Sequence, residues 1–413
     1  MNQDAIEKDV CERFVRYVQI YTTSDRHSSK VPTTDNQWDL LKLLKAELTD
    51  LGMSDIELDD KGFLFARLPG SKGYENLPYI GLMAHVDTAE DAPGENIKPQ
   101  LHEQYDGNKI VLKEGITIDP QEEPELLRYV GKTVITTDGT TLLGADDKAG
   151  VAEIMTMLVY LKAHPDFPHP PLEIIFTPDE ETGAGMDRFP LDKVRSKYAY
   201  TMDAGEEGEI EAECYTAYYA RVSFKGIPIH PGYARGRLVN SISMAIAYMN
   251  MIPRSESPEA TDGRFGNYWA QTIQGSVQNS FIDIYIRDFN TEQVERRVKA
   301  LESFARATEA AFPGGVVTVE AKKQYLNMKD ELDKHPLVMD KLRKALENAG
   351  VEAKEKSIRG GTDGARLTEL GVPCPNVFAG GHNFHSCKEW VGLPTMVKSV
   401  DVLLELIKLW TEK

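Results

Sequence analysis

Short apolar runs alternate with longer helical patterns through the first half of the chain. Residues 38–51 place most of their leucines on one helical face, and residues 150–161 repeat that spacing. Runs rich in β-branched, aromatic or other apolar residues at 79–83, 172–176 and 198–202 predict strands between such helices. This rhythm is typical of βαβ units, so we expect an α/β domain with a mostly parallel sheet flanked by helices.

The pattern changes near residue 213. Strand-like alternation at 215–224 and 281–289 combines with helical patterns at 239–252 and 291–312. These elements predict a small α+β domain built as a two-layer sandwich.

After residue 325 the pattern of alternating strands and helices returns, with a helix expected near 336–349 and a strand at 374–378. The second domain is therefore predicted to be inserted into the first. We expect a discontinuous domain of residues 1–212 and 325–413, interrupted by a domain of residues 213–324.

Charge and composition exclude several function classes. The 413 residues carry 47 Lys and Arg against 65 Asp and Glu, a net charge of −18. This charge repels a phosphate backbone and an anionic bilayer, so neither nucleic acid nor membrane is expected as a main partner. The N-terminal segment is acidic where a secretory signal is basic, and no apolar run is long enough to span a bilayer. We therefore expect a cytoplasmic protein.

The four cysteines are scattered without a CxxC pair, which fits reduced thiols better than a disulfide framework or a thiolate metal site. Any metal must then be held by histidines and carboxylates.

Side chains able to bind metal follow several of the predicted strands at once. They are His85 with Asp87, Glu180 with Glu181, Asp203, and His382 with His385; Asp146 with Asp147 joins them from a loop directly before a helix. In an open α/β sheet, ligands gather outside the carboxyl ends of the strands, so these groups are expected to converge.

Each of these groups also has an ordinary explanation. A single histidine is more often a hydrogen-bonded structural residue, adjacent glutamates are usually solvated, and Asp146 and Asp147 suit a helix N-terminus. Together, however, they would form an uncompensated cluster of acids unless cations neutralise it. Histidine with carboxylate suits zinc, with Mn²⁺ or Co²⁺ as substitutes. Two histidines and three carboxylates are about right for two metals that share a bridging carboxylate, and one further carboxylate remains as a base.

The motifs that contain these residues resemble the peptidase T family, which comprises tripeptide aminopeptidases among the dinuclear-zinc amino- and carboxypeptidases. The matching segments are MAHVDTA (83–89), TLLGADDKAGVAEIM (141–155), FTPDEETGAG (176–185), YTMDAG (200–205), IHPGYARGRLVN (229–240), IRDF (286–289), RGGTDGA (359–365) and GGHNFHSCKEW (380–390). The resemblance covers nearly the whole chain in order. It implies a catalytic domain with an inserted lid domain, a homodimer through the lid, and short peptides with a free N-terminus as substrates.

The resemblance also implies roles for single residues. His85, Asp146 and Asp203 would bind one zinc ion, and Asp146, Glu181 and His385 the other, with Asp146 as the bridge. Asp87 would accept the far N–H of His85 and orient the ring. Glu180 would be the general base, taking a proton from the metal-bridging water and passing it to the departing amine.

Four further residues complete the implied site, and His230 lies in the inserted domain. His230 would stabilise the oxyanion, and a lid-mediated dimer would let it reach the site of a partner subunit. Asn240, Arg287 and Arg359 would hold the substrate backbone or its C-terminal carboxylate. Surface salt bridges are the alternative for both arginines.

Two departures from the family pattern stand near the C-terminal motif. Ser386 and Cys387 occupy positions where relatives more often have a glycine and a further histidine, so Cys387 is either an oxidisable thiol beside a ligand or a buried neutral one. His385 is preferred to His382 as the ligand because of its place before the SCKE run. The competing hypotheses are another enzyme of the same clan, such as a dipeptidase, carboxypeptidase or deacylase, and a non-catalytic scaffold.

Overall fold

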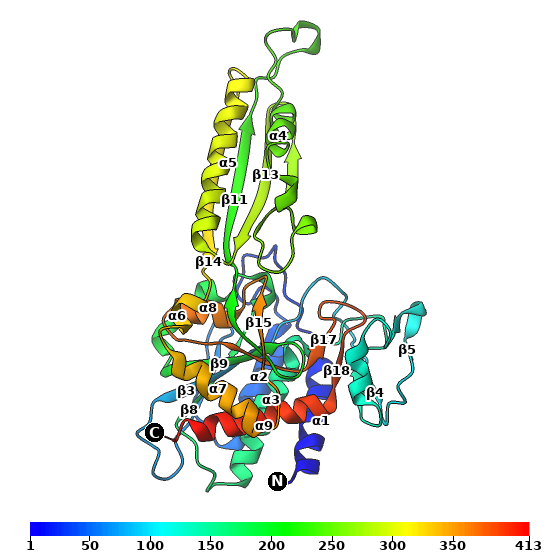
Figure 1. The fold of residues 1–413 in the computed structure, drawn as a ribbon, viewed down its shortest axis with the longest axis vertical. Helices are drawn as coiled ribbons and strands as arrows, with labels where there is room; N and C mark the ends of the chain where they lie inside the picture. The colour runs from blue at the N-terminus through cyan, green and yellow to red at the C-terminus, as the bar shows by residue number, and fades with distance from the viewer. Residues whose placement is uncertain (413) are drawn as a thin grey trace. The chain divides into compact units, whose positions relative to one another are not determined.

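The computed structural model describes residues 1–412, which divide into two compact units. Unit 1 comprises Met1–Ala212, Asp330–Lys356 and the chain from Thr362 onwards, and unit 2 comprises Glu213–Lys329 and Ser357–Gly361. The fold is α/β with an α+β unit inserted into it, which confirms the predicted fold class (Figure 1).

An eight-stranded sheet forms the centre of unit 1. Its strands, in spatial order, are β1 (Ser54–Leu58), β2 (Leu64–Leu68), β8 (Leu172–Thr177), β3 (Tyr79–His85), β9 (Ser196–Ala204), β16 (Asn376–Phe378), β10 (Glu209–Cys214) and β15 (Lys354–Ile358). The middle strands β8, β3, β9 and β16 pair in parallel, whereas β1 with β2, β2 with β8, and β10 with β16 are antiparallel. The parallel centre is apolar along its strands because both of its faces are covered.

The helices of unit 1 are α1 (Gln3–Val18), α2 (Gln37–Leu51), α3 (Ala145–Ala163), α6 (Lys329–Leu332), α7 (Pro336–Asn348), α8 (Asp363–Glu369) and α9 (Leu393–Leu409). Helix α3 packs on β3 and β9 and also contacts α1 and α9. It is therefore buried along nearly all of its surface, rather than on one face as its spacing of apolar residues predicts.

A smaller antiparallel sheet of unit 1 consists of β17 (Gly381–His382), β18 (Trp390–Gly392), β7 (Val134–Thr136) and β4 (Gln100–His102). Trp390 is fully buried in its core, with the Tyr129 ring edge-on at 5.6 Å between centroids. A hairpin of β5 (Ile110–Val111) and β6 (Thr117–Ile118) adds to the same core. This sheet anchors the segment that carries His385.

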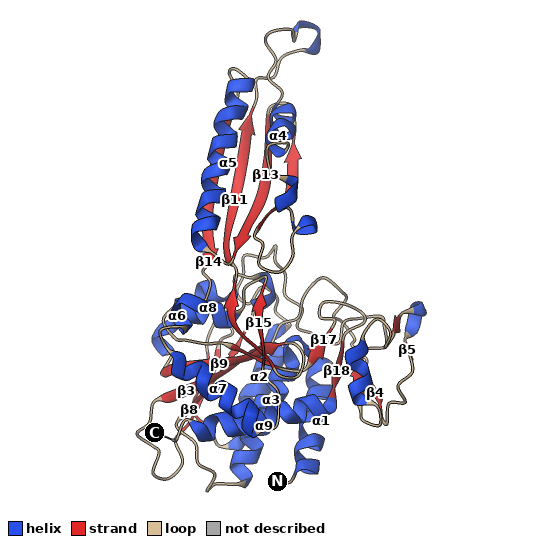
Figure 2. Ribbon diagram, viewed as in Figure 1, coloured by secondary structure: helices blue, strands red, loops and turns tan. Residues whose placement is uncertain are grey.

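Unit 2 is a four-stranded antiparallel sheet covered by two helices, with strands and helices distinguished in Figure 2. The strand order is β12 (Asn267–Gly275), β13 (Asn279–Asp288), β11 (Thr216–Lys225) and β14 (Val316–Tyr325), and the helices are α4 (Ser241–Met249) and α5 (Thr291–Ala311). Alternate strand residues such as Val222 and Ile284 pack against Met244 of α4 and Leu301 of α5. This arrangement is the predicted two-layer sandwich. Strand β12 was not predicted, since a bulge between Ala270 and Thr272 interrupts its alternation.

Short 3₁₀ turns connect these elements: η1 (Lys113–Gly115), η2 (Pro124–Tyr129), η3 (Glu180–Thr182), η4 (Gly185–Arg188), η5 (Leu191–Lys193), η6 (Pro231–Tyr233), η7 (Arg254–Glu256) and η8 (Pro258–Ala260). Among residues 1–412, none of the helices has both the length and the apolar content needed to cross a bilayer.

Candidate metal centre

The predicted ligands of unit 1 lie where neighbouring parallel strands end. His85 is the last residue of β3, Asp203 lies near the end of β9, and Glu181 lies in η3, just after β8. Asp146 stands at the start of α3, with a cis peptide bond to Asp147. The sheet order places β8, β3 and β9 side by side, so their carboxyl ends meet at one edge.

The Asp146 carboxylate lies between two histidines. Its Oδ1 is 2.8 Å from Nε2 of His85, and its Oδ2 is 3.3 Å from Nε2 of His385. Asp203 Oδ1 is 3.5 Å from the same His85 nitrogen, and Glu181 Oε2 is 3.1 Å from the same His385 nitrogen. The cluster therefore has two halves, each with one histidine and one further acid, and Asp146 belongs to both.

Protonation of this cluster shows that it needs positive charge. Burial and then the charge of Asp146 raise the pKa of Glu181 to about 8, and burial raises that of Asp203 to about 6. Hydrogen bonds to Asp146 and Glu181 raise the pKa of His385 to about 11. Burial opposes the protonation of His85, yet its hydrogen bonds to Asp146 and Asp203 leave its pKa well above the usual value. Protons thus gather where cations would otherwise balance the acids.

The donor set fits a divalent cation. One ligand atom each of His85, Asp146 and Glu181 lies within 4.8 Å of the others. Glu181 Oε1 is buried and has no hydrogen-bond partner in the described chain, so one oxygen remains available for coordination. Imidazole with carboxylates and no thiolate is the chemistry of zinc, manganese or cobalt sites.

Asp87 fixes the orientation of its neighbours. Nδ1 of His85 donates to the Asp87 backbone carbonyl at 3.1 Å, which turns Nε2 toward Asp146 and Asp203. The Asp87 carboxylate lies 3.3 Å from the same Nδ1 and accepts the backbone N–H groups of Glu180 at 3.0 Å and Glu181 at 3.2 Å. Asp87 therefore positions η3 as well as the histidine.

The Glu180 carboxylate differs from that of Glu181. No hydrogen bond or ion pair engages it within residues 1–412, and burial together with the charge of Asp203 raises its pKa well above the usual value. A half-buried carboxylate with a raised pKa beside the cluster is suited to general base catalysis.

Two buried acids beside the cluster were not assigned as ligands, and both accept hydrogen bonds from backbone N–H groups. Asp147 accepts the N–H groups of His85 at 3.2 Å and Gly150 at 3.3 Å. Glu389 accepts those of four consecutive residues, Leu143–Asp146. Although Asp147 lies within 4.8 Å of His85 and Asp203 through its nearest oxygen, its carboxylate already holds the backbone in place.

His382 and Cys387 take no part in the cluster. The His382 ring stacks on Trp390, with 3.9 Å between centroids and 5° between planes, and burial lowers its pKa to about 4. Burial and the charges of Glu114 and Asp138 raise the pKa of Cys387. Its thiol is therefore not activated as a thiolate.

The other predicted site residues belong to unit 2. His230 is exposed and its Nδ1 accepts the N–H of Gly232 at 3.1 Å, and Asn240 caps α4 by accepting the N–H of Ile242 at 2.9 Å. Both side chains thus make local hydrogen bonds, and their roles toward the substrate stay predictions.

The two arginines predicted to bind substrate are neighbours within unit 2. Arg287 Nη1 donates to the Arg359 carbonyl at 3.4 Å, and Arg359 Nη2 donates to Thr261 Oγ1 at 3.1 Å. Neither guanidinium pairs with a carboxylate in the part of the chain that the structure describes, and Arg287 Nε is buried without a partner. The salt-bridge alternative is therefore not what the structure shows.

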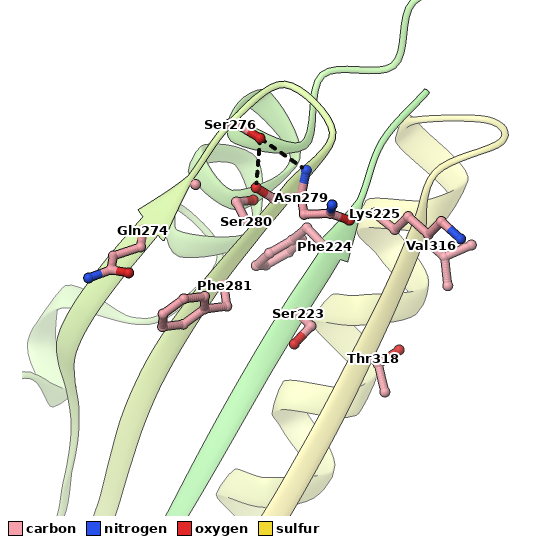
Figure 3. A pocket seen from close by; sticks show the side chains of 11 residues that line it. Ser223, Phe224, Lys225, Gln274, Ser276, Asn279, Ser280, Phe281, Val316 and Thr318 are labelled. Atoms are coloured by element: carbon pink, nitrogen blue, oxygen red, sulfur yellow. Dashed lines mark hydrogen bonds between the residues drawn. The ribbon is translucent and has the colours of Figure 1, made fainter. Parts of the chain in front are cut away.

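A separate cavity of about 540 Å³ opens on unit 2, at the hairpin end of its sheet. Figure 3 shows Lys225, Phe281 and Thr318 around it, with the Ser276–Asn279 turn at its rim. It contains none of the predicted site residues, so it is not the candidate centre.

Comparison with known proteins places this geometry in a family. The family model "Peptidase family M20/M25/M40" matches residues 131–409. The chain is 43% identical over 410 residues to "Peptidase T" of Geobacillus thermodenitrificans (strain NG80-2), covering 99% of this chain and 100% of that one. "Peptidase T" of Clostridium acetobutylicum is also 43% identical, over 408 residues covering 98% and 100% of the two chains.

Solved structures share the fold over almost the whole chain. The aminopeptidase PepT from Bacillus cereus ATCC 10987 has a TM-score of 0.74 at 24% identity and covers 98% of this chain and 99% of its own. A tripeptidase from Staphylococcus aureus subsp. aureus Mu50 has a TM-score of 0.77 at 21% identity, with the same coverage.

The protein is a hydrolase of the metallopeptidase class, as these matches and the cluster of histidines and carboxylates at the sheet edge show. The chain belongs to the peptidase family M20/M25/M40 and, within it, to the peptidase T family. This confirms the resemblance found in the motifs.

Proposed function

We propose that the chain is a metallo-aminopeptidase that hydrolyses the N-terminal peptide bond of tripeptides and releases a free amino acid and a dipeptide. The observation that carries the proposal is the Asp146 carboxylate shared between His85 and His385, each with a further acid beside it. The names of the relatives, Peptidase T, and of the two solved structures, an aminopeptidase and a tripeptidase, support the substrate class.

Two Zn²⁺ ions per subunit are the proposed cofactors, with Mn²⁺ or Co²⁺ as substitutes. His85, Asp146 and Asp203 would hold one ion, and Asp146, Glu181 and His385 the other. When bound, such ions polarise the substrate carbonyl and lower the pKa of water at the site. The raised pKa values of Glu181 and His385 support this assignment, because a cation would replace the protons held there.

Glu180 is the proposed general base. Its carboxylate would take the proton of the attacking water and then deliver it to the departing amine. The backbone N–H of Glu180 donates a hydrogen bond to the Asp87 carboxylate, which fixes the Glu180 backbone. The Asp87 carbonyl also accepts a hydrogen bond from His85, so Asp87 positions both the proposed base and a proposed ligand. Glu181 cannot replace Glu180, because its Oε2 already faces His385.

Residues of unit 2 would bind the substrate. His230 is the proposed oxyanion donor, and Asn240, Arg287 and Arg359 are proposed to hold the peptide backbone or its C-terminal carboxylate. The adjacent arginines support this role, since neither guanidinium has an acidic partner among residues 1–412 and a carboxylate offers bidentate pairing.

A homodimer through unit 2 is the proposed assembly. Nine of the sixteen large apolar side chains that are exposed among residues 1–412 belong to unit 2, including Ile242 and Ile246 of α4 and Ile273 of β12. Exposed apolar side chains in such numbers favour an interface on this unit. Ile246→Glu should convert the dimer to monomer in analytical ultracentrifugation, and a wild-type monomer would refute the assembly.

The four free cysteines support a cytoplasmic location.

Metal analysis combined with chelator-sensitive hydrolysis of Ala-Ala-Ala tests the proposal. We expect two metal equivalents per chain and hydrolysis that is lost on chelation and restored by zinc. Tightly bound metal without hydrolysis of any short peptide would favour the scaffold hypothesis instead.

A further inference from the structure

Glu389 holds the loop that carries the proposed bridging ligand. Its side chain is buried, with 1% of its surface exposed. Oε2 accepts the backbone N–H groups of Leu143 at 2.7 Å and Gly144 at 2.9 Å, and Oε1 accepts those of Ala145 at 2.7 Å and Asp146 at 3.2 Å. One carboxylate thus fixes four consecutive peptide groups that end at Asp146.

The segment that supplies Glu389 also supplies His385. The two residues are four positions apart, and the Glu389 N–H closes the intervening turn by donating to the Ser386 carbonyl at 3.2 Å. Trp390 follows directly, pairs with Thr136 of β7 and donates from Nε1 to Glu123 at 2.7 Å. The small sheet therefore fixes the position of Glu389 independently of the Leu143–Asp146 loop.

The contacts require a carboxylate rather than a neutral group. Four N–H donors converge on two oxygens, so all acceptor positions face donors. An amide in the same place would direct its NH₂ group at two of these donors, which removes two hydrogen bonds and adds a repulsion. The loop conformation therefore depends on both carboxylate oxygens of Glu389.

We propose that Glu389 is a positioning residue, which sets the place of the Asp146 carboxylate relative to His385 by fixing the Leu143–Asp146 backbone. The inference rests on the proposed metal centre, in which Asp146 is shared by both ions. A bridging ligand must meet two ions at once, so a displacement of its backbone changes both sites together.

Glu389→Gln and Glu389→Asp test this inference in the full-length protein. Zinc affinity is measured by competition with a chromogenic chelator, and kcat and KM for Ala-Ala-Ala are measured at saturating zinc. We expect Glu389→Gln to weaken zinc binding by roughly 10- to 100-fold, as for other groups that hold metal ligands in place. KM should change less than kcat, since the loop carries a ligand and no proposed substrate contact. Glu389→Asp keeps the charge and should show a smaller loss.

Glu173→Gln is the matched control. Glu173 is fully buried in β8 and accepts the N–H groups of Arg195 at 3.0 Å and Ser196 at 2.9 Å, but it contacts no predicted ligand. It should lower the melting temperature and leave zinc affinity unchanged. Should Glu389→Gln fail to fold, Glu389→Asp carries the comparison.

Wild-type zinc affinity in a folded Glu389 variant would overturn the inference, as would an equal loss of zinc affinity in Glu173→Gln. If the wild-type protein itself binds no metal, the proposed function is wrong, and the role of Glu389 is then wrong as well. This outcome differs from wild-type zinc affinity in a Glu389 variant, which contradicts the role of Glu389 alone.

Discussion

Asp146, Glu180 and Glu181 are all acids near the same cluster, yet their surroundings give them different chemistry. Asp146 lies between two imidazoles, and although burial alone would raise its pKa, hydrogen bonds with His385 and His85 lower it below the usual value. Glu181 pairs with the His385 imidazole, whereas no ion pair or hydrogen bond joins Glu180 to an imidazole within residues 1–412. A residue type therefore says little about its role until its partners are known.

Replacing the two adjacent glutamates should separate catalysis from metal binding. Glu180→Ala should retain two metal equivalents and lose turnover by about 10²- to 10⁴-fold, the usual range for a general base. Glu181→Ala should lose metal and turnover together. Metal content by mass spectrometry of the native protein and initial rates with Ala-Ala-Ala provide the two readouts. Near-normal activity of Glu180→Ala would show that the base is another residue.

Glu153 should make stability fall as pH rises. It is buried in α3, and its Oε2 accepts a hydrogen bond from Ser399 at 2.6 Å while Oε1 has no partner in the described chain. Burial raises its pKa well above the usual value, so the folded protein retains a proton that the unfolded chain releases above about pH 4.3. Its contribution to stability is full below that pH and is lost as pH rises through the folded pKa.

Glu153→Gln removes this titration while keeping a neutral side chain of the same shape. The melting temperature of the variant relative to wild type should therefore increase steadily between pH 5 and pH 9. A difference that is constant over this range would contradict a buried, protonated Glu153.

The sequence reveals some of these residues and conceals others. His85, Glu181 and Asp203 stand out because each follows an apolar strand, and strand order brings such positions together, whereas Asp146 stands out at the start of a helix. Asp147 and Glu389 act by accepting backbone N–H groups, and any residue can supply an N–H group. Their function has no sequence signature, although Glu389 lies only four residues after His385.

At the scale of elements, burial depends on tertiary neighbours that a local pattern does not encode. The apolar spacing of α3 predicts one buried face, but β3, β9, α1 and α9 all pack on this helix and bury nearly all of its residues. Strand β12 is missed because of its bulge, and β1 and β2 give weak signals as short strands at the sheet edge. Long regular elements such as α5 are predicted well because their contacts repeat along the whole helix.

Helix α5 provides a test at this scale. Leu301 is fully buried in the core of unit 2, so Leu301→Ala should lower the free energy of unfolding by about 2–5 kcal/mol through lost burial and a residual cavity. The neighbouring Glu302 is exposed, and Glu302→Ala should change it by less than about 0.5 kcal/mol. Chemical denaturation of the two variants measures both values. Equal effects would mean that α5 does not pack on the sheet as described.

At the scale of the whole molecule, part of the excess of acidic residues lies in the candidate metal centre. The chain carries a net charge of −18, and part of it is gathered in the buried cluster of unit 1. Buried like charges destabilise the folded state unless a cation balances them. The proposed ions would therefore stabilise the fold as well as supply chemistry.

Metal binding should raise the melting temperature in a concentration-dependent way. At a free zinc concentration of 100 times Kd, the stabilisation from one site is about 2.7 kcal/mol. Differential scanning calorimetry during zinc titration should show a rising transition, and a chelator should reverse it. Asp146→Asn should show little or no rise, since it removes the shared ligand. A zinc-independent transition in the wild type would contradict a metal centre.

The most direct test of the account is product analysis with zinc-loaded protein and four peptides: Ala-Ala, Ala-Ala-Ala, Ala-Ala-Ala-Ala and N-acetyl-Ala-Ala-Ala. We predict release of Ala and Ala-Ala from the free tripeptide alone, and loss of that release on chelation. Cleavage of the acetylated tripeptide or of the dipeptide instead would contradict a tripeptide aminopeptidase and favour another activity of the same metal centre.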